Sequence, residues 1–228
     1  LAAVFALVGA AALWRITADL PSPDALLTRR SGDTTKILDR HGQPLYEVLD
    51  PRAGRRTRVA LADLPPHVVD ATVAVEDARF FEHPGVDARA VARAAWQLAR
   101  EGRVVSGAST ITQQLARQVL LARDEREART LRRKAREMVL ALRITRRFAR
   151  EDILAMYLNE VYYGQMAYGI EAAARTYFGK PAAQLDLAES AMLAGLIQSP
   201  AAYNPLVDLD AARRRQATVL RLMVKAGR

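Results

Sequence analysis

The sequence has no cysteine among its 228 residues, which excludes disulfide bonds and thiolate chemistry. Its three histidines, His41, His67 and His83, are too scattered to suggest a zinc site, so any metal would need oxygen ligands. There is no internal repeat and no low-complexity segment, and half of the residues are apolar. The chain is therefore neither fibrous nor disordered, and its length suits one domain or two closely packed lobes.

Positive charge is in excess, with 34 Lys and Arg against 25 Asp and Glu and a formal net charge of +9. Such a balance indicates an anionic partner: nucleic acid, an acidic membrane surface or a phosphorylated substrate. Residues 123–150 alone hold eleven Lys or Arg and four acids, within one predicted helical region. On charge alone, the simplest interpretation of that run is a solvated helix face.

The first fourteen residues are apolar and uncharged, and Trp14 and Arg15 close them. A bilayer-spanning helix needs about 20 residues. Because the chain does not begin with Met, we expect residues 1–16 to be the outer part of a single-pass membrane anchor, with Trp14 at the interface. The tail of a cleaved signal peptide and a buried helix are the alternatives. Residues 17–34, with Pro21–Asp24, then predict a stiff membrane-proximal linker, and residues 35–228 the main domain.

Within the main domain the only clear β signal is at residues 36–48, where two short runs around Asp39 predict a hairpin. Everything beyond Pro65 is typical of helices, with capping-box spacing at Thr110 with Gln113 and at Asp186 with Glu189. The predicted fold is mostly α, with two helical lobes around a cleft. We expect helices at residues 66–76, 87–101, 129–147, 151–162, 169–177 and 210–226, and from about 110 and 187.

Glu76 and Asp77 lie where an apolar helix should end, directly before Phe80, Phe81 and the turn His83-Pro84-Gly85. A carboxylate at such an end is partly desolvated, and desolvation raises its pKa and makes it a better general base. The alternative is a simple ion pair with Arg79. Five residue types at fixed spacing favour the catalytic interpretation.

Gly107 to Gln114 joins a glycine loop to a helix start that is rich in hydroxyls and amides. Free backbone N–H groups and the helix dipole suit such a place to phosphate or sugar. Beyond it, apolar residues recur every four positions and leave a polar face that can converge on a ligand. A plain capped surface helix is the alternative. That polar face carries Thr110, Gln113, Gln114 and Arg117.

Glu137 lies one helical turn after Arg133 and Lys134, so the three side chains can share a face. Two nearby cations keep a carboxylate ionised, and the same cations could neutralise a diphosphate leaving group. A surface ion-pair ladder is the alternative.

In order and spacing these stretches resemble the peptidoglycan glycosyltransferases, which include the polymerase domain of class A penicillin-binding proteins. The resemblance runs from about Ile37 to the C-terminus and rests on several ordered blocks. They are Glu76-Asp77-x-x-Phe80-x-x-His83-x-Gly85, Gly107–Gln114, Arg133-Lys134-x-x-Glu137, Ile153–Asn159, Ala167–Ala174, Tyr177–Lys180, Leu193–Gly195 and Tyr203–Pro205.

The resemblance implies a lysozyme-like helical lobe and a smaller membrane-proximal lobe. It also implies an enzyme that polymerises lipid II on the outer face of the cytoplasmic membrane. The residue matching Glu76 would take the proton from the acceptor's 4-hydroxyl. That oxygen would displace lipid diphosphate from the growing strand with inversion, giving a β-1,4 linkage.

Other residues take roles from the same resemblance. Arg133 and Lys134 would stabilise the diphosphate, and Glu137 would orient them or help to hold Mg²⁺ or Mn²⁺. Ser109, Thr110, Gln113 and Gln114 would line the donor site. The remaining substrate-binding residues would be Asp77, Phe80, His83, Gly107, Arg117 and Asn159. A cell-wall synthesis complex is an implied partner, and nucleic acid is not.

Two features depart from the family pattern. Arg117 stands where the family usually has a lysine, so the positive charge is kept but a planar fork replaces a compact ammonium. The sequence also lacks the Ser-x-x-Lys of a transpeptidase domain. It is thus expected to be a monofunctional polymerase or part of a bifunctional one.

Two other functions remain open from the sequence. A lysozyme-like glycan hydrolase or lytic transglycosylase would use Glu76 as an acid on finished glycan, but it needs no diphosphate clamp or lipid-facing anchor. A non-enzymatic basic module would bind nucleic acid or anionic lipid through residues 123–150, and salt would weaken that binding steeply.

Overall fold

The computed structural model describes residues 16–28, 32–41, 44–48, 54–102, 107, 109–128 and 130–228. The chain forms two compact units, unit 1 from residues 1–30 and 81–153 and unit 2 from residues 31–80 and 154–228. The fold is mostly helical with a short N-terminal hairpin, as predicted. The predicted anchor, apart from Ile16, lies outside the described residues. In the part of the chain that the structure describes, every helix is too short or too polar to span a bilayer.

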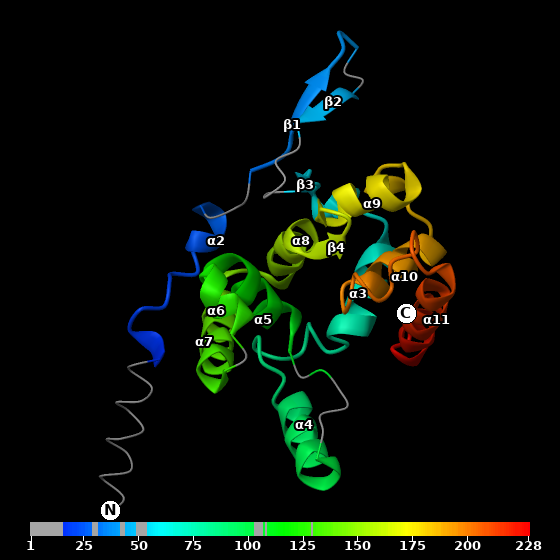
Figure 1. Ribbon diagram of the computed structural model, residues 1–228. Helices are drawn as coiled ribbons and strands as arrows, with labels where there is room; N and C mark the ends of the chain where they lie inside the picture. The colour runs from blue at the N-terminus through cyan, green and yellow to red at the C-terminus, as the bar shows by residue number, and fades with distance from the viewer. Residues whose placement is uncertain are drawn as a thin grey trace, which may run out of the picture. The chain divides into compact units, whose positions relative to one another are not determined.

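Unit 1 is built around the packing of α5 against α7 (Figure 1). Ile111 and Leu115 of α5 and Leu140 and Ile144 of α7 are fully buried, which accounts for the apolar stripe in the sequence. Its elements are α2 (Ala25–Thr28), α4 (Ala88–Glu101), α5 (Ile111–Leu115), the π-helical turn η2 (Ala116–Leu120), α6 (Arg123–Glu127) and α7 (Leu131–Arg147). Helix α8 (Arg150–Glu160) begins in unit 1 and continues into unit 2.

Residues 17–28 of the predicted linker pack within unit 1 instead of standing apart from it. Leu26 of α2 is buried, and Asp24 pairs with Arg147 at 2.8 Å. Asp19 pairs with Arg136, which is itself buried on α7 and also pairs with Glu125 at 2.6 Å. Part of the basic run at residues 123–150 thus forms internal ion pairs.

Unit 2 has a core of three helices, α3, α10 and α11, which lie side by side in Figure 1. Small residues such as Ala71, Ala74, Ala191 and Ala194 line the contact and let the helices approach closely, and Val219 and Met223 fill the remaining space. Its helices are α3 (Pro66–Glu76), α9 (Ile170–Phe178), α10 (Leu187–Leu196), α11 (Leu209–Lys225) and the 3₁₀ turns η1 (Leu61–Asp63) and η3 (Ala182–Gln184).

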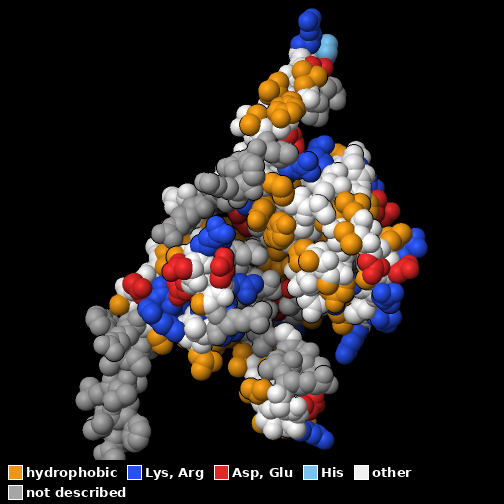
Figure 2. Space-filling model, in the orientation of Figure 1, with side chains coloured by type: hydrophobic (Ala, Val, Ile, Leu, Met, Phe, Trp, Pro, Cys, Tyr) orange, Lys and Arg blue, Asp and Glu red, His pale blue; other side chains and the backbone are white. Residues whose placement is uncertain are grey.

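The predicted hairpin is confirmed as β1 (Thr35–Leu38) paired with β2 (Pro44–Val48), antiparallel with Thr35 opposite Val48. Figure 2 shows hydrophobic side chains on its surface, near the top of the view. They belong to large apolar residues that are exposed: Ile37, Leu38, Leu45, Tyr46 and Val48. Lys36 and Arg55 both pair with Glu47 across this region, at 3.9 and 3.7 Å.

The expectation that everything beyond Pro65 is helical is wrong at residues 162–168. There β4 (Tyr162–Gly164) and β5 (Ala167–Tyr168) join β3 (Arg55–Arg56) in a sheet of order β3-β5-β4. Strands of two or three residues are too short to show an alternating pattern, and β3 comes from a distant part of the sequence. The parallel pairing of β3 with β5 relies on Gly54 (φ +69°), because a Cβ there would lie 2.5 Å from the Met166 carbonyl oxygen.

Candidate functional site

Lys134 on α7 gathers polar groups from the start of α5 within unit 1. Its Nζ donates to Ser109 Oγ at 2.7 Å, to Gln113 Oε1 at 3.1 Å and to Glu137 Oε2 at 3.4 Å. The structure therefore brings Ser109 and Gln113, predicted to line the donor site, together with Lys134, predicted to stabilise the diphosphate, and with Glu137, predicted to orient that lysine. The α5–α7 packing holds them, since Ser109 and Gln113 flank the N-cap of α5.

Arg133 and Glu137 form the second part of this arrangement. Arg133 donates to Glu137 Oε1 and to the Ala128 carbonyl oxygen, which fixes the guanidinium at both ends. Glu137 is only 1% exposed, and each oxygen of its carboxylate pairs with a cation. A buried carboxylate between two cations orients both of them.

The pKa of Lys134 is lowered, first by burial and then, to a smaller extent, by the charges of Arg117 and Arg133, while Glu137 opposes the shift. Arg117, on η2, thus lies close enough to Lys134 to affect it. We name Arg117, Arg133 and Lys134, with Glu137, the cationic cluster. With three cations and one carboxylate, the cluster has an excess of positive charge, which suits an anionic group such as a diphosphate.

The start of α5 is tied to the His83-Pro84-Gly85 turn. Thr110 forms the predicted capping box with Gln113, and its Oγ1 also donates to the Gly85 carbonyl at 2.6 Å. His83 is buried; its Nδ1 accepts from the Gly85 N–H at 3.2 Å, and its carbonyl accepts from Arg150. His83 therefore shapes the turn that supports the donor residues.

The polar side chains on the donor side differ in burial. Gln113 is fully buried, and its Nε2 has no hydrogen-bond partner among the described residues. Gln114 is half buried on α5, and Gly107 is exposed. The roles predicted for these residues in binding substrate stay predictions.

In unit 2, Glu76 is the last residue of α3 and Asp77 is its C-cap, as the sequence predicted. Glu76 is half buried, Asp77 is mostly buried, and Phe80 is fully buried. The apolar face of α3, which includes Val73 and Ala74, enters the core, so the carboxylate stands at the edge of an apolar region. The position of Glu76 at this helix end is as predicted, and its role as a base stays a prediction.

Tyr163, on β4, is a neighbour of Glu76 that the sequence did not predict. The pKa of its phenol is raised, mainly by complete burial and further by the Glu76 carboxylate. Its hydroxyl has no hydrogen-bond partner within the described part of the chain. No local pattern marks this residue, because Tyr163 and Glu76 are far apart in the sequence and come near each other only in the folded chain.

Asn159 near the end of α8 acts on the backbone. Its Oδ1 accepts from the Val59 N–H at 2.9 Å, and its Nδ2 donates to the carbonyls of Val59 and Ala155 at 2.9 and 2.8 Å. The amide thereby clamps the segment after β3 onto α8. Substrate binding by Asn159 stays a prediction.

Metal binding by Glu137 also stays a prediction. The described residues contain no group of three or more His, Asp or Glu side chains placed to hold a metal ion. Both oxygens of Glu137 face cations, and that environment repels a divalent cation. The arrangement as it stands does not fit Mg²⁺ or Mn²⁺.

Comparison with known proteins gives one family and several relatives. The family model described as Transglycosylase matches residues 41–224. Penicillin-binding protein 1A of Aquifex aeolicus (strain VF5) is 42% identical over 209 residues, which cover 92% of this chain and 28% of the relative. For penicillin-binding protein 1A of Escherichia coli (strain K12) the identity is 46% over 173 residues, which cover 76% of this chain and 20% of the relative. For penicillin-binding protein 1A/1B of Bacillus subtilis (strain 168) the identity is 38% over 226 residues, which cover 98% of this chain and 24% of the relative.

The family match over most of the chain, which agrees with the mostly helical fold, identifies a transglycosylase. The chain belongs to the transglycosylase family, as a transglycosylase domain of the class A penicillin-binding protein type. It spans between 20% and 28% of the length of the three relatives named above.

Proposed function

We propose that the chain is a peptidoglycan glycosyltransferase that polymerises lipid II into β-1,4-linked glycan strands. In the proposed reaction Glu76 takes the proton of the acceptor's 4-hydroxyl, and that oxygen bonds to the anomeric carbon of the growing strand. The bond from this carbon to the lipid diphosphate breaks with inversion, and the diphosphate leaves as an anion. The proton stays on Glu76 until solvent removes it.

The cationic cluster is the observation that carries this proposal. A leaving diphosphate gains negative charge as its bond breaks, and preorganised cations stabilise such a transition state. Arg133 and Lys134 are held by Glu137 and by the start of α5, so they need little reorganisation during the reaction. Arg117 adds a third charge near Lys134, which supports a diphosphate-binding role despite the missing lysine.

The setting of Glu76 supports the other half of the proposal. Glu76 is half buried at the end of an apolar helix, and its charge acts on the fully buried phenol of Tyr163. A position that is partly shielded from water suits the proposed role as general base. The proposed location is the outer face of the cytoplasmic membrane, with residues 1–16 as the anchor. There the enzyme would meet its lipid-linked substrate, the growing strand and the proteins of a cell-wall synthesis complex.

A lysozyme-like hydrolase is the second candidate, because it too would use a desolvated glutamic acid. Incubating the purified chain with labelled lipid II, and separately with finished glycan, distinguishes the two. We expect glycan strands to form from lipid II and finished glycan to keep its length. We also expect synthesis to continue in the presence of a metal chelator, because both oxygens of Glu137 already face cations. Shortening of finished glycan without synthesis would instead establish a hydrolase.

A further inference from the structure

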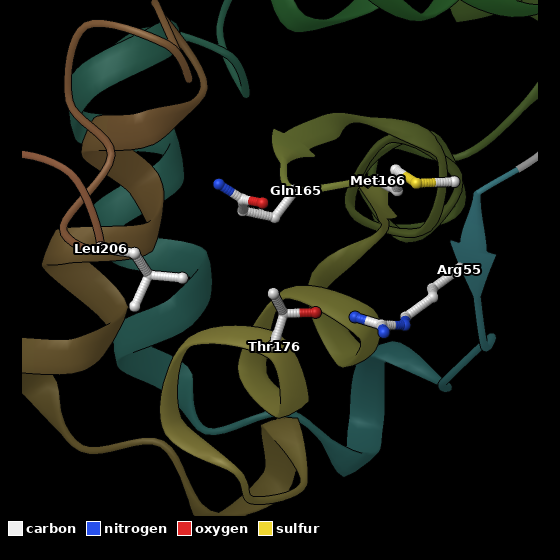
Figure 3. A pocket seen from close by; sticks show the side chains of 5 residues that line it. All are labelled: Arg55, Gln165, Met166, Thr176 and Leu206. Carbon is white, nitrogen blue, oxygen red and sulfur yellow. The ribbon is translucent and has the colours of Figure 1, made fainter. Parts of the chain in front are cut away.

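A cavity of about 370 Å³ lies in unit 2 beside the turn that joins β4 to β5. We propose that it binds the carboxylate end of a short peptide. Figure 3 shows its lining, with the Arg55 guanidinium and the Thr176 hydroxyl pointing toward one another from β3 and α9. Gln165 and Met166 of the turn and Leu206 complete the wall. None of these residues belongs to the cationic cluster or to the surroundings of Glu76 described above.

The turn that supplies two of these side chains is strained. Gln165 has φ +50° and Met166 φ +58°, both in the left-handed region. Two-residue hairpin turns with this geometry favour Asn-Gly, because other residues cost about 1–2 kcal/mol there. Strain of this kind persists only where the surrounding structure holds it in place, and it clusters at functional sites. Here the strained residues place a primary amide and a thioether at the cavity.

Thr176 provides an unsatisfied polar group at the same place. Its Oγ1 is buried and has no hydrogen-bond partner among the described residues. An unpaired buried hydroxyl costs about 1–3 kcal/mol, which a ligand acceptor would recover. Because the hydroxyl points toward Arg55, one acceptor group could bond to both (Figure 3).

The positive charge of Arg55 favours an anionic ligand. Its backbone N–H donates to the Met166 carbonyl at 2.7 Å, which anchors β3 to the turn. Its side chain makes a long ion pair with Glu47 at 3.7 Å, and 39% of it is exposed. A carboxylate therefore already approaches this guanidinium, but at a distance beyond that of a good charge-assisted hydrogen bond. A ligand carboxylate in the cavity could form the closer contact.

The shape and polarity favour a carboxylate with a small apolar neighbour over a phosphate. One guanidinium matches one negative charge, and Met166 and Leu206 offer apolar contact beside it. A second cavity of about 380 Å³ shares Gln165 and Met166 and is further lined by Tyr162, Gly164, Pro200, Ala201 and Asn204. A ligand that continues past its terminal residue can thus extend along the turn, as a peptide would.

The test uses the full chain labelled with ¹⁵N, and N-acetyl-alanyl-alanine as the probe. We expect the backbone amides of Gln165, Met166 and Thr176 to shift and to saturate with a Kd on the order of 1 mM. Arg55→Gln and Thr176→Val should each weaken binding about tenfold. Arg213→Gln, which removes an exposed charge from α11, should leave it unchanged.

Two further probes require no variant. The C-terminal amide of the same peptide should bind about tenfold more weakly than the free acid, and inorganic phosphate should also bind more weakly. Equal binding of acid and amide, tighter binding of phosphate, or unchanged affinity in both Arg55→Gln and Thr176→Val would overturn the proposal. The readout does not depend on polymerisation, so this proposal and the proposed function can fail separately.

Discussion

At the scale of single residues, the cationic cluster is held together by one buried side chain, that of Glu137, which pairs with two cations. Glu137 is buried and takes Arg133 on one oxygen and Lys134 on the other, while Lys134 also reaches Ser109 and Gln113. The sequence predicted the shared helix face of Arg133, Lys134 and Glu137, because spacing on a helix is local. It predicted neither the depressed pKa of Lys134 nor the proximity of Tyr163 to Glu76, because both depend on burial in the folded chain.

The buried lysine gives a pH dependence that can be measured. Burial holds the folded-state pKa of Lys134 below its ordinary 10.5, so the folded protein loses this proton at lower pH than the unfolded chain. Between the two pKa values the unfolded chain binds more protons, and the free energy of unfolding contributed by Lys134 rises with pH. The difference between wild type and Lys134→Met should therefore grow in favour of wild type from about pH 7 to about pH 10.

Urea denaturation at both pH values measures this difference. Lys225→Met, which removes an exposed lysine at the end of α11, is the matched control. An identical pH trend in the two variants would show that burial of Lys134 has no energetic consequence.

At the scale of elements, the sequence predicted helices better than strands. Capping boxes at Thr110 and Asp186 are local signals, and the structure confirms both. Helix α4 ends at Glu101 as expected, with Gly102 as a left-handed C-cap. The sheet of β3, β4 and β5 was missed because it joins very short strands from distant parts of the chain. The short helix α2 was missed because Pro21 and Pro23 suggested an extended linker, whereas the burial of Leu26 stabilises a helical turn after them.

The His83-Pro84-Gly85 turn should be among the least tolerant elements of unit 1. Gly85 has φ +98°, and a Cβ there would lie 2.5 Å from both the Ala141 carbonyl oxygen and Thr145 Oγ1. Gly85→Ala should therefore lower the free energy of unfolding by about 3 kcal/mol or more. Urea denaturation followed by circular dichroism measures the loss.

Gly102→Ala is the control, because Gly102 also has a positive φ (+67°) but nothing within 4 Å of the added Cβ. It should cost about 1 kcal/mol, from backbone conformation alone. Similar losses in the two variants would mean that the contact of the turn with α7 contributes little.

At the scale of the whole molecule, the family and the fold class were accessible from the sequence because ordered blocks span most of the chain. The match to the transglycosylase family over residues 41–224 confirms that prediction. The family match does not establish the roles of individual site residues. The donor-side residues of unit 1 gather as predicted, and Glu76 stands at its predicted helix end, but binding and catalysis by these residues remain proposals.

The central claim is that Glu76 is the general base of glycan polymerisation, and the direct measurement is the rate of strand synthesis from labelled lipid II by Glu76→Gln. A general base contributes about 10²-fold to 10⁴-fold, so the variant should lose at least about a hundredfold in rate while keeping its thermal unfolding transition. Glu151→Gln, at an exposed position on α8, should polymerise at the wild-type rate. Synthesis by Glu76→Gln at the wild-type rate would contradict the account.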